Sequence, residues 1–147
     1  METAIKVADY ILRSQDHEEP DITKLKLQKL LYYTQGFFLA EFDKPLFDDQ
    51  IEAWDHGPVV PNVWNHFSSI KGNLLEVPDQ DIDLHLNEEE KQSLDEVIEL
   101  HSQYSAWALR EMSHNEEPWI VAYNNGKGTV IPQDEIKIFF KTKIVDC

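Results

Sequence analysis

The chain of 147 residues carries 28 acidic and 13 basic side chains, which gives a formal net charge of -15. Such a surface repels a phosphate backbone, so direct binding of nucleic acid is not expected. With 41% hydrophobic and 11% aromatic residues, the composition is that of a globular protein rather than a disordered one. We therefore expect one folded domain over residues 1–147.

The chain contains one cysteine, Cys147, so a disulfide or a cysteine-based metal cluster within the chain is excluded. The first residues lack the basic and apolar regions of a secretion signal, and no apolar stretch reaches the length of a membrane span. These features predict a cytoplasmic protein that does not bind a membrane.

The first two predicted helices differ in how much of their surface is apolar. An amphipathic helix is expected near the start and ends at the polar run 14–21. Thr23 is expected to cap a second helix over residues 24–42, whose apolar side chains extend almost all round it. This is the expected central helix, and Gly36 inside it predicts the close approach of another backbone.

The middle of the chain is expected to be less helical. Residues 43–54 predict a small hairpin or a pair of short strands. Gly57 and Pro58 then predict a stiff corner between a strand and a helix, and Pro61 suits the first turn of that helix. Residues 71–86 predict a long connection.

The second half of the chain again predicts helices. Asn87 is a good cap for a helix whose first turn holds three glutamates, and these favour the positive end of the helix dipole. Shorter helices are expected to begin at Ser105 and at Glu116 or Glu117, and a last helix lies within 131–143. The expected fold is mainly α, an α+β protein with a minor β-hairpin, built as a compact single-domain helical bundle around a central hydrophobic helix.

The stretch "EAWDHGPVVPNVWNHF", residues 52–67, is the main candidate for chemistry. Asp55 and His56 are adjacent, and together with His114 they form the candidate set for a small metal-assisted enzyme. However, the histidines show no recognised ligand spacing, and the chain has neither a nucleophile elbow nor a phosphate-binding loop. We therefore expect a protein that is not an enzyme and uses no cofactor or metal, and keep the metal-assisted enzyme as an alternative.

The aromatic residues and one further histidine suit a packed interior. Trp54, Trp64, Trp107 and Trp119 follow turns or lie on apolar helix faces, which predicts that each is buried. One or two half-exposed rings would still suit an interface, because binding hot spots favour tryptophan and tyrosine. His101 lies on an apolar helix stripe, which is typical of a hydrogen-bonded core histidine.

Three stretches, containing "KLQKLLYY", "EAWDHGPVVP" and "SHNEEPW", together resemble the Panacea domain family, also described as SocA-like or phage-associated (GepA-like) antitoxins. The resemblance spans most of the chain. Where that family commonly has a tyrosine or a tryptophan-histidine pair after the "QG" step, this chain has Phe37 and Phe38, so no histidine site is expected there.

The resemblance implies an antitoxin of a bacterial or prophage toxin–antitoxin system that neutralises a cognate toxin by direct protein binding. In the SocA branch it implies a proteolytic adaptor for a Clp-type protease. We expect no DNA binding, and the oligomeric state stays open, as does a phage-encoded factor that acts on a host protein. The residues expected to present the binding surface are His56, Gly57, Pro58, His114, Glu117 and Trp119, with fold maintenance as the structural alternative for each.

Overall fold

The computed structural model describes residues 2–15 and 21–144, and Cys147 lies outside these ranges. Helices make up most of the regular structure, and three short strands form one small sheet. The helices are α1 (Ala4–Arg13), α2 (Lys24–Phe42), α3 (Pro61–Phe67), α4 (Glu88–Ser102), α5 (Ala106–His114), α6 (Glu117–Asn124) and α7 (Gln133–Lys141). The strands are β1 (Glu52–Trp54), β2 (Gly57–Val59) and β3 (Thr129–Val130). The predicted mainly α fold with a minor β part is confirmed.

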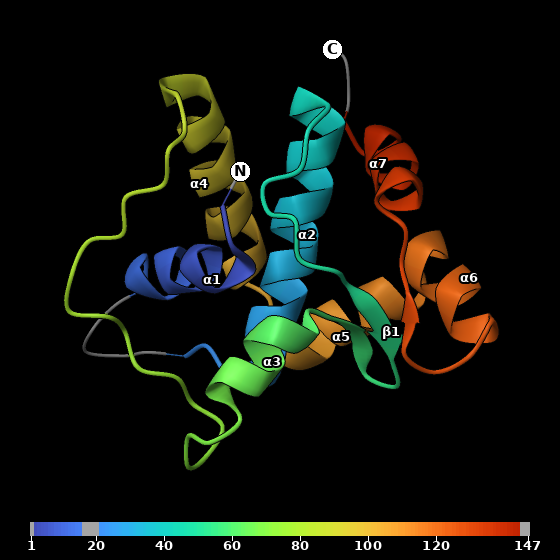
Figure 1. The fold of residues 1–147 in the computed structure, drawn as a ribbon, viewed down its shortest axis with the longest axis horizontal. Helices are drawn as coiled ribbons and strands as arrows, with labels where there is room; N and C mark the ends of the chain where they lie inside the picture. The colour runs from blue at the N-terminus through green and yellow to red at the C-terminus, as the bar shows by residue number, and fades with distance from the viewer. Residues whose placement is uncertain (1, 16–20, 145–147) are drawn as a thin grey trace.

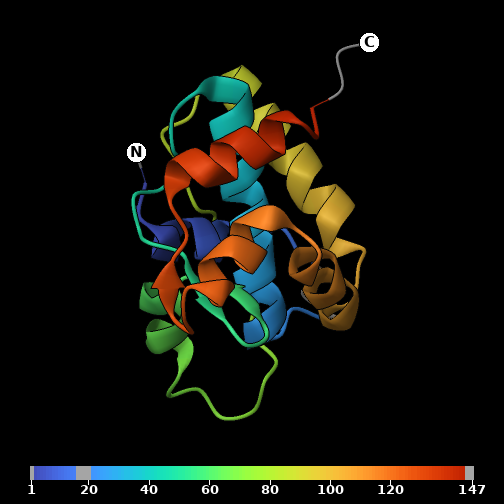
Figure 2. The same cartoon turned by 90° about the vertical axis from the view of Figure 1, so that its right-hand side faces the viewer.

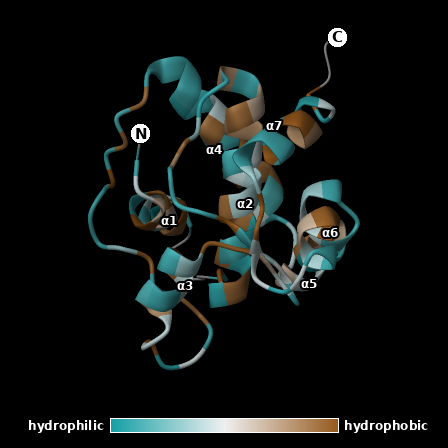
Figure 3. Cartoon of the chain, turned by 45° about the vertical axis from the view of Figure 1, so that its right-hand side comes forward, coloured by the Kyte–Doolittle hydropathy of each residue, from teal (hydrophilic) through white to brown (hydrophobic). Residues whose placement is uncertain are grey.

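Helix α2 is the centre of the fold. Figure 1 shows α1 and α4 on one side of α2 and α7 on the other, and Figure 2 shows α7 crossing in front of α2. Most residues of α2 are buried, including polar ones, so its ribbon in Figure 3 carries teal segments as well as brown ones. The prediction of a central helix buried on several sides is confirmed, since α2 contacts α1, α3, α4, α5 and α7.

The predicted caps define where three helices begin. The Thr23 hydroxyl accepts a hydrogen bond from the backbone N–H of Lys26 at 3.0 Å. Asn87 forms a capping box with Glu90, in which each side chain accepts from the other residue's backbone N–H. The Ser105 hydroxyl caps α5 in the same way as Thr23 caps α2. Each cap satisfies a backbone donor that the helix itself leaves unpaired, which contributes about 1 kcal/mol.

The sheet lies further along the chain than predicted. Strand β1 pairs antiparallel with both β2 and β3, and the β1–β2 turn consists of Asp55 and His56. The strands expected within 43–54 are therefore correct only at their C-terminal end. The predicted corner around Gly57 and Pro58 is itself the second strand of the hairpin, and Pro58 fits there because β2 is an edge strand.

Gly36 does allow a close approach, but the prediction of an approaching backbone is wrong. A Cβ atom at Gly36 would lie 2.3 Å from the ring carbons of Phe140. The Phe140 ring of α7 therefore occupies the space that a side chain on α2 would fill. This contact helps to hold α7 against the central helix.

The predicted long connection between α3 and α4 is confirmed, because residues 71–86 contain neither a helix nor a named strand. Figure 1 shows this segment running along the outside of the molecule beside α1 and α4. It is tied to the body by backbone hydrogen bonds at both Ile22 and Lys24. Within the described part of the chain, no helix combines the length and the apolarity that a membrane crossing needs.

Candidate functional site under the hairpin turn

Two buried glutamines fix the hairpin and the loop before it on α2. The Gln28 side chain accepts a hydrogen bond from the backbone N–H of Val60 at 2.9 Å. The Gln35 amide bonds the backbone of residues 46–47 through both its oxygen and its nitrogen. Buried polar side chains of this kind stabilise a fold when they are paired, so they position the hairpin turn over the middle of α2.

Lys29 is the exception among these buried polar side chains. The residue is 0% exposed, and its Nζ atom has no hydrogen-bond partner in the described ranges 2–15 and 21–144. Burial lowers the pKa of Lys29 from 10.5 to about 7, and the charge of Arg110 lowers it further in the same direction. A buried amine without a partner is costly in its charged form, so the site invites an explanation beyond packing.

The backbone of Gly57 lies directly on Lys29. Gly57 has a φ of +117°, and a Cβ atom there would lie 2.8 Å from Cε of Lys29 and 2.9 Å from Oγ of Ser113. Only glycine allows both this backbone conformation and this approach. The Gly-Pro step therefore brings the hairpin down onto α2 and α5, a contact that the sequence analysis did not foresee. The sequence offered no signal for it, because Lys24, Lys26 and Gln28 precede Lys29 in the same helix.

Two half-buried histidines lie beside the lysine. Nδ1 of His56 and Nε2 of His114 are buried and lack a hydrogen-bond partner among the residues that the structure describes. Burial lowers the pKa of both imidazoles. The charge of Lys29 lowers the pKa of His56 further, and the charge of Arg110 does the same for His114. We call Lys29, His56, Arg110, Ser113 and His114 the Lys29 cluster.

Three tryptophans surround the histidines. The ring centroids of Trp54 and Trp64 lie 6.0 and 5.8 Å from that of His56, and Trp119 lies 4.2 Å from His114. Nε1 of Trp119 donates to the backbone oxygen of Trp54 at 2.8 Å, which ties α6 to the hairpin. These three residues are half-buried, so each leaves part of its surface open.

Trp107 differs from the other tryptophans. It is 67% exposed, so the prediction that it is buried is wrong. The Arg110 guanidinium lies 4.9 Å from the centre of its ring, in cation–π geometry. Trp107 is the second residue of α5, and it lies on the opposite side of the helix from the buried residues Leu109 and Ser113.

The Asp55 carboxylate is engaged on the outer side of the turn. It accepts hydrogen bonds from Tyr123 and, at 3.2 Å, from Lys127, and these bonds lower the pKa of Asp55. No group of three or more His, Cys, Asp or Glu side chains in the described ranges is arranged to hold a metal ion. The geometry therefore gives no support to the metal-assisted alternative with Asp55, His56 and His114.

The residues expected to present a surface fall into two groups. Five of them come together around the hairpin turn. Gly57 and Pro58 are buried there, whereas His56, His114 and Trp119 are half-buried. Glu117 is exposed in the first turn of α6 and lines a small pocket with residues of α7.

Glu116 forms a second polar site, which is partly buried and which sequence reasoning considered only as a helix start. Its two carboxylate oxygens accept hydrogen bonds from the hydroxyls of Tyr32 and Tyr33, each at 3.0 Å. Burial raises the pKa of Glu116 from 4.5 to about 7, against the opposing effect of the two tyrosine hydrogen bonds. Beside it, His101 stacks on Tyr33 and its Nδ1 atom lies 2.8 Å from the backbone oxygen of Val97, which confirms a core histidine.

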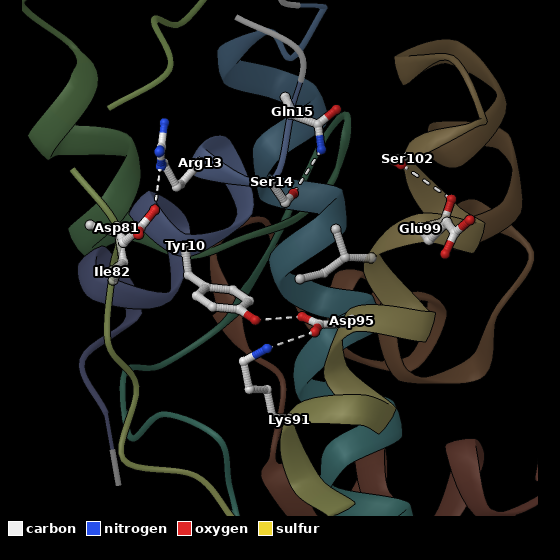
Figure 4. Close-up of a pocket in the computed structure, with 11 residues that line it drawn as sticks. Tyr10, Arg13, Ser14, Gln15, Asp81, Ile82, Lys91, Asp95, Glu99 and Ser102 are labelled. Atoms are coloured by element: carbon white, nitrogen blue, oxygen red, sulfur yellow. Dashed lines mark hydrogen bonds and ion pairs between the residues drawn. The ribbon is translucent and has the colours of Figure 1, made fainter. Parts of the chain in front are cut away.

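Figure 4 shows a separate polar pocket of about 830 Å³ between the end of α1, the loop around residue 81 and α4. The Tyr10 hydroxyl donates to Asp95 at 2.5 Å, and Lys91 bonds the same carboxylate at 3.2 Å. Arg13 pairs with Asp81 across the opening at 3.0 Å. Arg13, Asp81, Lys91 and Asp95 are thus paired with one another or with Tyr10 in this pocket.

The fold and the cluster define a small, mainly helical domain in which a two-residue turn is held over a buried lysine and flanked by half-exposed aromatic rings. The chain matches the SocA-like antitoxin family, the Panacea domain, over residues 27–120. It is also 33% identical over 140 aligned residues to the antitoxin SocA of Caulobacter vibrioides (strain NA1000 / CB15N), which covers 84% of this chain and 71% of the relative. No solved structure matches the chain. The chain belongs to the SocA-like antitoxin family.

Proposed function

We propose that this protein is the antitoxin of a toxin–antitoxin system and neutralises its toxin in the cytoplasm by direct protein contact. The observation that carries the proposal is family membership over residues 27–120, together with the similarity to a protein named antitoxin SocA. A non-enzymatic role is part of this proposal, and it is supported by the similarity to a protein named as an antitoxin.

The contact surface that we propose consists of the half-exposed residues around the hairpin turn. His56, His114 and Trp119 lie there, and Glu117 extends the surface onto α6. Gly57 and Pro58 act beneath it by fixing the turn, since both are buried. Aromatic rings held in place by packing bind with little loss of side-chain freedom, which is typical of interface hot spots.

The charge of the chain supports a basic partner. A net charge of -15 attracts a positively charged toxin from a distance and raises the association rate. Long-range attraction is screened by salt, so we expect the association rate to fall as the ionic strength rises. The affinity itself then rests on the buried contacts around the turn.

The proposal allows two modes of neutralisation. In the first, the antitoxin covers the active surface of the toxin. In the second, it acts as an adaptor that delivers the toxin to a Clp-type protease. Measuring the amount of toxin protein in the cell distinguishes the two modes. An antitoxin that covers the toxin leaves this amount unchanged, whereas an adaptor lowers it only when the protease is present.

The test is co-expression of this chain with the product of the adjacent gene. We expect growth to be rescued and a complex to be recovered, and Glu117→Lys to weaken both. Glu88→Lys is the matched control, because Glu88 is likewise an exposed glutamate in the first turn of a helix and the charge change is the same. If the wild-type chain gives neither rescue nor a complex, the antitoxin role fails.

One outcome of that test leads to a different function. A phage-encoded factor that acts on a host protein would be indifferent to the adjacent gene product. It would be recovered with a host protein from lysate, and the same Glu117→Lys variant would show whether the same surface is used.

A further inference from the structure

Three nitrogen atoms of the Lys29 cluster point to an incomplete site. Nζ of Lys29, Nδ1 of His56 and Nε2 of His114 are the buried side-chain nitrogen or oxygen atoms without a hydrogen-bond partner in the described part of the chain. They come from α2, the hairpin turn and α5, so the tertiary fold gathers them from three separate elements. Unpaired buried polar atoms are rare in folded proteins, and a group of three in one place calls for a ligand.

The acidic residues near the cluster already have partners, Asp55 outside it and Glu111 on Arg110 within it. Asp55 bonds Tyr123 and Lys127 on the outer side of the turn. Glu111 pairs with Arg110 at 3.0 Å and leaves the histidines without a carboxylate partner of their own. A protein with a net charge of -15 thus has a local cluster of basic groups without a matching buried acid in the described ranges.

We propose that the Lys29 cluster binds a small oxyanion of the phosphate class. A protonated lysine and protonated histidines are hydrogen-bond donors only, so their natural partner is an oxygen that carries negative charge. The anion enters beside His56 and His114, which are half-exposed, while Lys29 contributes its charge from beneath. This site shares His56 and His114 with the proposed toxin contact, but phosphate titration of the isolated chain and co-expression with the adjacent gene product test the two proposals separately.

A phosphate-type dianion fits the cluster better than a single carboxylate. Several basic groups lower one another's affinity for protons here, because Lys29 and Arg110 both lower the pKa of His56. A ligand with two negative charges offsets this repulsion for more than one group at once. Half-buried Trp54, Trp64 and Trp119 partly shield the site from water, which strengthens an electrostatic contact.

Binding of the anion must be linked to uptake of protons. The bound anion favours the charged forms of Lys29, His56 and His114, whose pKa values burial has lowered. The charge of Asp55 raises the pKa of His56, and a backbone hydrogen bond at Asp55 and the charge of Glu111 raise that of His114, whereas Lys29 and Arg110 lower both. We therefore expect binding to be accompanied by proton uptake that is measurable in buffers of different ionisation enthalpy.

The experiment is a titration of the whole purified chain with inorganic phosphate and, separately, with a nucleoside monophosphate, followed by calorimetry and by the NMR signals of the histidine rings. We expect the ring signals of His56 and His114 to move and those of His66 to stay. Equal affinities for the two ligands identify free phosphate as sufficient, and a tighter monophosphate identifies a phosphorylated metabolite as the source.

Variants decide whether the cluster is responsible. Lys29→Met keeps the length of the side chain without its charge, and we expect it to weaken phosphate binding by at least about tenfold. His114→Gln serves as the second variant if the first does not fold. Lys91→Met and His66→Gln are the matched controls from outside the cluster and should bind as the wild type does. Absence of binding by the wild type, or equal binding by Lys29→Met and Lys91→Met, overturns the proposal.

Discussion

Lys29 is buried and Glu116 is partly buried; the two groups have opposite charge, and burial brings the pKa of each to about 7. The two sites differ in their partners. Glu116 receives hydrogen bonds from Tyr32 and Tyr33, so its environment is complete. Lys29 has no such partner in the described ranges. Two groups with the same pKa of about 7 can therefore belong to a complete structural site or to one that still needs a ligand.

The largest effect is expected from removal of the Glu116 carboxyl group. Glu116→Ala leaves two tyrosine hydroxyls, those of Tyr32 and Tyr33, without their acceptor, which should lower the free energy of unfolding by about 3–5 kcal/mol. Urea denaturation at pH 6 measures this loss in the free energy of unfolding. Glu117→Ala, at the exposed neighbouring position, should change the stability by less than about 0.5 kcal/mol. Equal losses in both variants would mean that the Glu116 site is not a structural one.

The pH dependence of stability should follow from the same group. The pKa of Glu116 is about 7 in the folded chain and 4.5 ordinarily, so the unfolded chain releases this proton first. Between these two values, stability falls as the pH rises, by about 3 kcal/mol in total. Glu116→Gln has no proton to lose, so its stability should not show this fall. The free energy of unfolding of both proteins, measured by denaturation at pH 4.5 and pH 8, tests this expectation. An equal change between the two pH values in the variant and the wild type would contradict it.

Removal of the Lys29 amine should stabilise the protein, whereas removal of the Glu116 carboxyl group should destabilise it. Lys29→Met replaces a buried amine without a partner by an apolar side chain of similar length, which should raise the free energy of unfolding by about 1–4 kcal/mol at pH 6. The pKa of Lys29 is about 7 in the folded chain and 10.5 ordinarily, so the wild type gains stability as the pH rises between these values. The advantage of the variant should therefore fade toward pH 10.

Lys91→Met is the control for that variant, because it removes the same charge from an exposed ion pair with Asp95. It should change stability by less than about 1 kcal/mol at any of these pH values. A destabilised Lys29→Met protein would show instead that the lysine makes a stabilising contact in the free protein.

The smallest effect is expected at the rim of the turn. Asp55→Asn removes a charge that raises the pKa of His56, so the pKa of this imidazole should fall further. Asp55 is exposed, and we expect no measurable change in stability. An NMR titration of the histidine ring measures the shift, and Asp48→Asn, another exposed position, serves as the control. An unchanged pKa of His56 would place Asp55 outside the electrostatic reach of the cluster.

Sequence reasoning succeeded where local chemistry decides the structure. Thr23, Asn87 and Ser105 begin helices because their side chains satisfy the first backbone donors, a property that needs no distant partner. The central helix was foreseen because apolar residues lie almost all round it. The hairpin was placed too early because β1 is defined by pairing with β2 and with β3, and β3 is only two residues long.

The candidate site was foreseen only in part. His56, Gly57, Pro58, His114 and Trp119 were expected at a surface, and the structure brings them to one turn. Lys29 and Glu116 were missed because their importance depends on burial by other elements. A single lysine in a helix sequence gives no sign of which neighbour will cover it.

The sequence by itself determined the helical class of this protein, the caps of its helices, its strong negative charge and its resemblance to the antitoxin family. These follow from spacing, composition and motifs that are local in the chain. Only the tertiary structure decided that Gly57 lies on Lys29 and that Phe140 fills the space beside Gly36. The physical reason is that burial, the loss of water and the meeting of charges are properties of segments far apart in the sequence, and they arise only when α2 is surrounded.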